Sequence, residues 1–424
     1  MARYKQNKVK NMNNEKFKKP NNIYEVIVLL SFIAVFSMRN VPIIMYATQL
    51  LFIIFSMLRC KSKKVKIIYF TSSLLFFMWC VASLVWSSDF ASCIKFILEI
   101  SQIFVFTSFL SFNLDDYDMI DKCLHFIGIS FIILIIYTIF QTPLEEFKNI
   151  YLYNLDISSD EGRLGYTIGM HPNTLGYMCA VGCFLWLQFY KKYKKKSYLI
   201  ICGLLIILLL FTKSRTSMLL LLAYLLVNYL FSTKSNAKKV LMVIVGVVLV
   251  GIALNFIMTN EFMYNLIGFR FEGVLNLFNK KNAVDASITG RKQLINAGME
   301  IVRQYPIFGV GAGNYAYVAY NKFHIWREVY SHSNLIELLS GLGIVGFLIY
   351  YIPKIVCICG LLNILKREHK NKNITCFFLT FIICELIFDY SCITYNNDAI
   401  QIINTLAFCY YLNERKEDYH ESNC

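Results

Sequence analysis

Twelve apolar segments dominate this 424-residue chain and constrain its fold more than any other feature. Hydrophobic residues make up 57% of the sequence, charged residues only 16%, and the mean hydropathy is +0.51. A hydrocarbon core about 30 Å thick needs about 20 apolar residues in a helix, so the shorter segments need polar ends or a tilt. The segments are 23–38, 40–58, 67–86, 91–112, 123–141, 172–190, 197–212, 216–231, 238–258, 333–364, 374–391 and 397–412. They predict an all-α polytopic membrane protein with about 12 transmembrane helices.

Clusters of Lys and Arg set the predicted orientation, because cationic residues in short loops stay on the cytoplasmic side. These clusters lie in 1–22, 59–66, 191–196, 232–239 and 366–372. Counting spans from a cytoplasmic N-terminus places every cluster inside and predicts that both termini are cytoplasmic. Most of the net charge of +15 is then a topology signal, so no nucleic-acid partner is expected.

The same count divides the chain into three parts. Residues 1–22, rich in Lys and Asn, are expected to form a disordered cytoplasmic tail. Residues 23–412 are expected to form a single transmembrane domain, and 413–424 a second cytoplasmic tail. The first span lacks an Ala-x-Ala cleavage site and is expected to act as an uncleaved anchor. The 14 Cys show neither external pairs nor a CxxC motif, so neither a disulfide framework nor a zinc site is expected.

Residues 259–331 are the one long stretch that is not strongly apolar, and the predicted topology places them in one large extracytoplasmic loop. This loop contains five acidic residues and a larger number of basic ones. A cationic loop on the external side predicts an anionic ligand. The basic residues are Arg270, Lys280, Lys281, Arg291, Lys292, Arg303, Lys322 and Arg327.

Charged residues within or beside the spans are costly in hydrocarbon and usually face protein or water. The predicted topology places nearly all of them in the outer half of the bilayer, where they are expected to line one polar cavity. They are Lys95, Glu99, Lys213, Arg215, Glu337, Glu385, Asp389 and Asp398. Lys95 and Glu99 either neutralise each other across one helical turn or have a function. Glu385 and Asp389 share a helix face and make either a structural contact or a substrate contact.

Two cations occupy a very tight external connection, Thr-Lys213-Ser-Arg215-Thr. Lys213 is expected to extend toward the membrane interface, as long cationic side chains do. A topological anchor at Arg215 would be on the wrong side of the membrane. A function is therefore favoured for Arg215.

Three further motifs lie on the predicted external side. The first, Arg163 to Gly176, contains His171-Pro172-Asn173, in which Pro and Asn suit a helix start. In the long loop, Thr289-Gly290-Arg291 precedes Pro306-Ile-Phe-Gly309-Val-Gly311-Ala-Gly313-Asn314-Tyr315. No predicted strand precedes these glycines, so they are not a dinucleotide-binding fingerprint. The third, His332-Ser-Asn334-Leu-Ile-Glu337, opens a helix in which Gly341, Gly343 and Gly346 permit close helix approach.

Together these motifs resemble the O-antigen ligase and polymerase superfamily. Arg215, Thr-Gly-Arg291, the glycine-rich loop and His-Ser-Asn334 carry the resemblance, and the stretch from Arg163 through His-Pro-Asn is similar to Wzy-type polysaccharide polymerases. The resemblance covers about residues 160 to 350 and implies a GT-C-like fold. It also implies a bacterial cell membrane enzyme without a cofactor.

The resemblance implies a glycosyltransferase that takes an oligosaccharide linked through diphosphate to undecaprenol. A polymerase transfers it to another lipid-linked repeat at the external face, for capsule, O-antigen or exopolysaccharide. A ligase transfers it to lipid A core or another terminal acceptor. The bilayer, a flippase and chain-length regulator proteins are the implied partners. A glycan flippase is a third interpretation, but the charges collect at the outer face rather than near the midplane, where a transporter needs them.

The residue chemistry independently fits transfer from a diphosphate donor. Guanidinium groups offer forked donors and stay protonated, so Arg215 and Arg291 are predicted to bind the departing diphosphate, with support from Arg163 and Arg270. This stabilisation would make a divalent metal unnecessary. His332 is a candidate base, since its ordinary pKa lies near neutrality, but it equally suits a hydrogen bond to phosphate or sugar.

The remaining candidates complete the predicted site. Glu337 either orients His332 or is itself the base, and Glu385 and Asp389 are reserve candidates. The predicted substrate-binding residues are Arg163, His171, Asn173, Arg270, Asn334, Glu337, Glu385 and Asp389.

Overall fold

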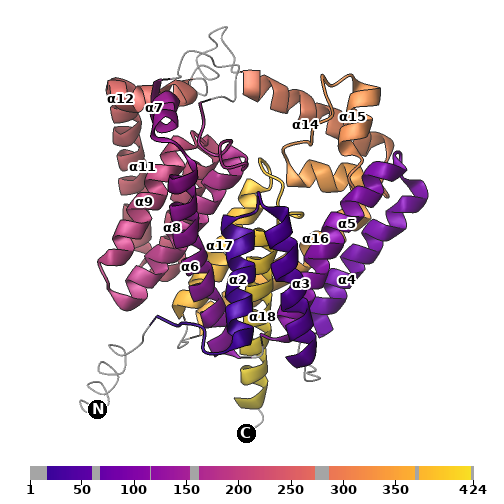
Figure 1. The fold of residues 1–424 in the computed structure, drawn as a ribbon, viewed down its shortest axis with the longest axis horizontal. Coiled ribbons are helices and arrows are strands. Elements are labelled where there is room, and N and C mark those ends of the chain that lie inside the picture. The colour runs from indigo at the N-terminus through magenta and orange to yellow at the C-terminus, as the bar shows by residue number, and fades with distance from the viewer. Residues whose placement is uncertain are drawn as a thin grey trace. The chain divides into compact units, whose positions relative to one another are not determined.

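The computed structural model describes residues 17–59, 67–114, 116–152, 162–272, 286–367 and 372–421, and these residues form helices and connecting turns without a strand (Figure 1). In chain order the elements are α2 (Ile23–Ser37), α3 (Pro42–Arg59), α4 (Ile67–Ala82), the short 3-10 helix η2 (Ser83–Trp86), α5 (Phe90–Phe112), α6 (Tyr117–Gln141), α7 (Leu144–Leu152), α8 (Pro172–Tyr193), α9 (Ser197–Phe211), α10 (Arg215–Ser232), α11 (Asn236–Thr259), α12 (Glu261–Met263), the π-helix η3 (Tyr264–Gly268), α14 (Ala286–Gln304), α15 (Tyr315–Phe323), α16 (Asn334–Lys366), α17 (Lys372–Phe388) and α18 (Asp398–Glu421).

Each of the twelve predicted apolar segments coincides with a helix. Most boundaries agree within a few residues, but α6 begins at Tyr117 and α18 continues to Glu421, beyond the apolar parts of those sequences. Among the described helices, seven are long and apolar enough to cross a membrane. They are α3, α4 with η2, α5, α6, α10, α11 and α16. The all-helical polytopic membrane class is thus confirmed, while the count of twelve spans, the orientation and the single large loop stay predictions.

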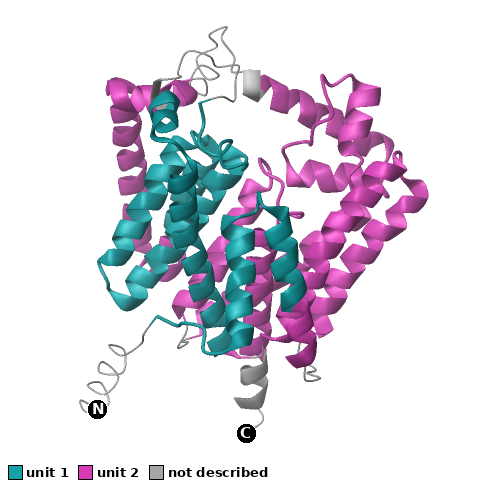
Figure 2. Cartoon of the chain, in the orientation of Figure 1, with its two compact units in different colours: residues 1–52, 118–153, 161–225 teal, residues 53–117, 154–160, 226–424 magenta. Residues whose placement is uncertain are grey.

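The chain divides into two compact units (Figure 2). Unit 1 comprises Met1–Phe52, Asp118–Tyr153 and Glu161–Leu225. Unit 2 comprises Ile53–Tyr117, Asn154–Asp160 and Leu226–Cys424.

In unit 1, α8 and α9 lie side by side, and α8 also contacts α6. The indole N–H of Trp186 on α8 donates to the Gly128 carbonyl on α6 at 3.2 Å. Phe17, from the segment predicted as a tail, stacks on the Trp186 ring at 5.7 Å between centroids. Burial alone lowers the pKa of Lys18, but its hydrogen bonds with Asp121 and Asp118 raise it above the ordinary value. Residues 17 and 18 are therefore attached to unit 1.

In unit 2, helices α4, α5, α16, α17 and α18 contact one another. Their shared core includes Phe96 and Ile100 of α5, Leu338 and Leu342 of α16, and Tyr395. A smaller core joins α14 and α15 to the first turns of α16, where Tyr315 and Ile336 meet Leu294. α11 has no buried residue, which suits a helix whose apolar sides face lipid.

The long helix α16 is broken at Gly343, where φ is 67° and ψ is −173°. The break frees backbone groups that would otherwise bond within the helix. The glycine-rich loop uses them: the N–H groups of Val310 and Gly311 donate to the carbonyls of Ser340 and Gly341, each at 2.9 Å. The loop and the start of α16 are thereby joined through their backbones.

Only glycine fits at position 343, for two reasons. A positive φ is costly for residues with a side chain, and a Cβ there would lie 2.0 Å from the Ile307 carbonyl oxygen. Beyond the break, the Ile344 N–H donates to the Pro306 carbonyl at 2.9 Å. At Gly343 the predicted close approach is thus made by a loop rather than by a helix. Gly346 faces the Trp79 ring of α4, which is the close helix packing that the sequence predicts.

The other side of the glycine-rich loop is attached to the connection between α4 and α5. The Ser88 N–H donates to the Val310 carbonyl at 2.9 Å, and the Ala312 N–H donates to the Ser83 hydroxyl at 3.0 Å. Asn314 accepts from the Asp89 N–H at 2.8 Å through its Oδ1. The loop is thus held on both sides by hydrogen bonds, most of them through its backbone.

Candidate active site

In unit 1, predicted site residues gather where α8 begins, α9 ends and α10 begins. Arg163 is buried, with 5% of its surface exposed. Its Nε donates to the Thr212 carbonyl at 3.0 Å, and its Nη2 donates to Asn173 Oδ1 at 2.7 Å. The Leu164 N–H also donates to the Phe211 carbonyl at 3.0 Å. The segment that begins at Arg163 therefore packs against the end of α9, just before Arg215 at the start of α10.

His171 and Asn173 shape the first turn of α8. His171 is the N-cap, and its Nδ1 accepts from the Asn173 N–H at 3.1 Å. Pro172 occupies the first helical turn, where its missing N–H has no cost. The predicted helix start is therefore correct in detail. The substrate-binding roles of His171 and Asn173 stay predictions.

Lys213 and Arg215 differ in environment although they are two residues apart. Lys213 is 2% exposed, and its ammonium donates to the Ile150 carbonyl of α7 at 2.7 Å. It does not extend outward as expected, because this carbonyl replaces water as its acceptor. Arg215 is half-buried at the first position of α10. A cation there faces the positive end of the helix dipole, so helix stability does not explain it.

In unit 2, His332 occupies a tight turn before α16. Its φ of 57° is in the left-handed region, which is unusual for a residue with a side chain. Buried serines flank it: the Ser333 N–H donates to the Ser331 hydroxyl at 3.2 Å, and that hydroxyl donates to the Ser333 carbonyl at 2.8 Å. Buried Glu337 accepts from the Ser331 N–H at 2.9 Å. The Glu337 side chain therefore supports the turn by binding the backbone of the turn. The half-buried His332 ring lies beside the Tyr330 ring, with 4.2 Å between their centroids.

Asn334 joins the start of α16 to the turn between α17 and α18. Its Oδ1 accepts from the N–H groups of Thr394 and Tyr395 at 2.9 and 3.0 Å. Its Nδ2 donates to the Tyr351 hydroxyl at 2.9 Å and to Asp389 Oδ2 at 3.3 Å. The amide of Asn334 is thus occupied by protein groups that hold the start of α16, and its substrate-binding role stays a prediction.

Asp389 is fully buried, and both its carboxylate oxygens accept hydrogen bonds. The Tyr351 hydroxyl donates to Oδ2 at 2.7 Å, and the Thr394 hydroxyl donates to Oδ1 at 2.6 Å. These contacts are of the structural kind that the sequence left open. A substrate contact by Asp389 stays a prediction.

Glu385 forms an ion pair with a residue that the sequence analysis missed. Lys354 of α16 donates to Glu385 Oε1 at 2.5 Å and to the Tyr350 hydroxyl at 2.8 Å. Asn404 of α18 also donates to Oε1, at 3.1 Å. The missed signal was a single lysine within the apolar segment 333–364, since an isolated charge in a span requires a partner.

Arg291 lies half-buried on α14, close enough to the turn between α17 and α18 for its charge to affect the Cys392 thiol. Burial raises the pKa of the Cys392 thiol, while the Ser391 hydroxyl and the Arg291 charge partly oppose that shift. Arg270 follows η3, and its guanidinium carbon lies 5.9 Å from the Phe269 ring centroid. Lys280 and Lys281 of the predicted cationic loop lie outside the described residues.

The predicted site residues are therefore divided between the two units. Unit 1 holds Arg163, His171, Asn173 and Arg215, and unit 2 holds Arg270, Arg291, His332, Asn334, Glu337, Glu385 and Asp389. Within the described ranges, no group of three or more His, Cys, Asp and Glu side chains is arranged to hold a metal ion. The catalytic and binding roles of all these residues stay predictions.

Comparison with known families supports the motif resemblance. Residues 175–351 match the family model described as O-Antigen ligase. This match confirms the resemblance to the O-antigen ligase and polymerase superfamily. It spans Arg215, Arg291, the glycine-rich loop and the His332 turn, and it ends at Tyr351, the hydroxyl partner of Asp389. No curated protein matches the chain. A membrane-embedded enzyme of glycosyltransferase type is the function that the family match supports.

Proposed function

We propose that this protein is a polysaccharide polymerase of the bacterial cytoplasmic membrane. It transfers undecaprenyl-diphosphate-linked oligosaccharide repeats onto another lipid-linked repeat at the external face. The family match carries the proposal, and Arg163 with its His-Pro-Asn partner segment favours the polymerase class. The orientation predicted from the basic clusters places both groups of site residues on the external side.

The proposed reaction is a displacement at the anomeric carbon of the donor sugar. A hydroxyl oxygen of the acceptor forms the new glycosidic bond, and the bond to the diphosphate breaks with both electrons leaving on phosphate oxygen. Forked N–H donors of arginine would stabilise that charge, and the sequence motifs nominate Arg215 and Arg291 for this role. His332 accepts the hydroxyl proton, and the support that the turn receives from Glu337 and Asn334 fixes its position.

A reconstituted assay tests the proposal. Purified protein is incubated with a synthetic undecaprenyl-diphosphate repeat unit, and products are separated by length. A ladder of multiples is expected with the wild type. For Arg291→Ala, loss of one charge-stabilising donor predicts roughly a hundredfold slower reaction. Lys292→Ala is the matched control, since Lys292 is the exposed neighbour of Arg291 and should retain full activity. A donor pool unchanged by folded wild-type protein would refute the proposal.

The description of the family model favours one alternative, a ligase that transfers glycan to a terminal acceptor. The same assay separates the two functions when lipid A core is added. Consumption of the donor only with that acceptor, yielding one joined product and no ladder, would establish a ligase. Ladder growth without lipid A core would establish a polymerase.

A further inference from the structure

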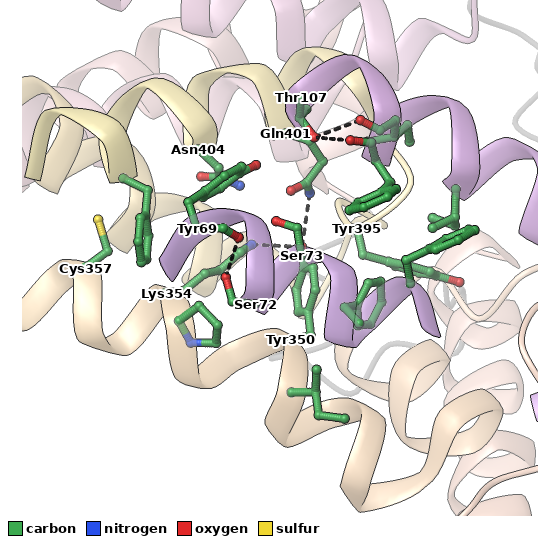
Figure 3. A pocket seen from close by; sticks show the side chains of 18 of the residues that line it. Tyr69, Ser72, Ser73, Thr107, Tyr350, Lys354, Cys357, Tyr395, Gln401 and Asn404 are labelled. Atoms are coloured by element: carbon green, nitrogen blue, oxygen red, sulfur yellow. Dashed lines mark hydrogen bonds between the residues drawn. The ribbon is translucent and has the colours of Figure 1, made fainter. Parts of the chain in front are cut away.

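A cavity of about 110 Å³ lies within unit 2 among α4, α5, α16, α17 and α18 (Figure 3). Aromatic rings from α4, α5 and α18 form much of its wall, including Phe76, Phe104 and Phe408. Polar side chains form another part: Tyr350, Lys354, Gln401 and Asn404 line it. None of the proposed catalytic residues lines this cavity, so it is a separate feature of the fold.

The polar side of the cavity carries no net charge. Lys354 is paired with Glu385 at 2.5 Å, and both side chains are buried. A charged ligand would need a counter-charge that this pair already satisfies, because an uncompensated charge is costly in such an environment. An uncharged ligand is therefore favoured.

Both a donor and an acceptor remain available on this side. The ammonium of Lys354 has three N–H donors, and its hydrogen bonds in the described structure are with Glu385 and Tyr350. The Asn404 amide must point its NH₂ at the Glu385 carboxylate, which leaves its buried Oδ1 without a partner among the described residues. Glu385 Oε2 is likewise without a partner among the described residues. A hydroxyl group accepts one hydrogen bond and donates another, so it satisfies Lys354 and Asn404 together.

The surroundings of the cavity are apolar. On α4, Leu75 and Met78 flank the lining residues and are 56% and 52% exposed. On α16, Ile352 and Ile355 flank Pro353 and Lys354 and are 51% and 52% exposed. Both helices are candidate membrane spans, and exposed apolar side chains on such a helix suit contact with hydrocarbon. A ligand that enters between them arrives from the lipid phase.

We infer that this cavity binds an uncharged lipid whose head group is a hydroxyl. The hydroxyl oxygen accepts from Lys354, and its hydrogen is donated to Asn404 Oδ1. Only the first carbons of the apolar chain fit beside the phenylalanine rings in a cavity of about 110 Å³, and the rest of the chain extends toward the hydrocarbon. A diacylglycerol and a free prenol share this chemistry. Arg215, Arg291 and His332 do not line the cavity, and Glu385 contributes to it through the ion pair with Lys354.

Photolabelling of the full-length protein in phosphatidylcholine nanodiscs tests the inference. The probes are a diacylglycerol with a diazirine in its acyl chain, the methyl ether of the same lipid and the corresponding phosphatidic acid. A diazirine-bearing C20 prenol is a further arm that distinguishes the two lipid sources. We expect the alcohols to label the Phe76 and Pro353 regions roughly tenfold more strongly than the ether, because only an alcohol donates to the buried acceptor.

Two variants locate the binding. Ser73→Phe places a ring in the cavity without touching the ion pair and should abolish the labelling, whereas Thr71→Phe, on the exposed side of the same helix, should leave it unchanged. Asn404→Leu should remove the preference for alcohol over ether. Thermal unfolding in nanodiscs verifies that each variant is folded.

Three results would overturn the inference. Equal labelling by the alcohols and the ether would remove the role of the hydroxyl hydrogen. Undiminished labelling of folded Ser73→Phe would place the lipid elsewhere. A high-resolution map with only water on Asn404 Oδ1, at saturating concentrations of both alcohols, would assign the cavity to solvent.

Discussion

The predicted site residues of unit 1 and the buried carboxyl groups around the His332 turn in unit 2 are held by opposite chemistry. In unit 1 the bonds described for Arg163 and Lys213 are from cationic donors to neutral oxygens, namely two backbone carbonyls and the Asn173 amide. In unit 2 the carboxyl oxygens of Asp389 and Glu337 accept bonds from neutral hydroxyl, amide and backbone donors. The first arrangement concentrates positive charge, and the second uses buried carboxylates as structural supports. Removal of Arg215 should therefore reduce activity first, whereas removal of the groups that support the His332 turn should reduce stability first.

The largest expected effect is the loss of stability in Asn334→Leu. The change leaves the N–H groups of Thr394 and Tyr395 without their acceptor and removes one donor from Asp389. Several buried groups lose partners together, so we expect a loss of about 4 kcal/mol in unfolding free energy. Chemical unfolding in detergent measures it. The exposed Asn321, whose side chain makes one described hydrogen bond, supplies the control Asn321→Leu. Equal stability of the two variants would show that the hydrogen bonds of Asn334 do not stabilise the start of α16.

Gly343→Ala is expected to destabilise unit 2 by about 3 kcal/mol, because it adds both a disfavoured φ and a backbone clash. Gly246→Ala is the matched control, since nothing lies within 4 Å of a Cβ at that position in α11. Because alanine has the higher helix propensity, Gly246→Ala should raise the unfolding free energy by roughly 1 kcal/mol. Thermal unfolding of the two variants provides the comparison, and a shift of the same sign in both would show that the helix break is not fixed by the loop.

Arg215→Ala should separate the units most clearly. We expect activity in the reconstituted assay to fall roughly a hundredfold, a barrier increase of about 2.7 kcal/mol. Its unfolding free energy should change by less than about 1 kcal/mol, because a cation at a helix start gains nothing from the dipole. Lys238→Ala removes a cation from the first turn of α11 and should leave activity unchanged. A stability loss in Arg215→Ala as large as in Asn334→Leu would end the distinction between the units.

The smallest expected effect is a gain in stability. His332→Gly should stabilise the protein by up to about 1 kcal/mol, because glycine adopts a φ of 57° without strain. The same variant should lose transferase activity. His332→Asn tolerates the same backbone conformation and lacks the imidazole, so it separates strain from chemistry. An active His332→Asn variant would show that His332 is not the base.

The helices were largely predictable from sequence because hydrocarbon requires long apolar runs. Pro172 also marked the start of α8, because a missing N–H is tolerated only there in a helix. The contacts that each motif makes within the fold were not predictable. The glycine spacing resembles a phosphate-binding fingerprint, whereas Gly309 lies against the backbone of Ser340 and Gly341 in α16, and Gly313 lies against the Phe96 side chain. Lys354 was overlooked because hydropathy averages hide a single charge, and its partner Glu385 is on another helix.

The backbone pairing of the glycine-rich loop with the start of α16 has a practical consequence for chimeras between relatives. Hydropathy places a natural junction near residue 331, between the polar segment and the following helix. A graft joined there would combine a loop from one parent with the helix break of another. A junction after Val345 keeps the pairs with Ser340, Gly341 and Ile344 within one parent, whereas the contacts of the loop with Ser83, Ser88 and Asp89 still cross between parents.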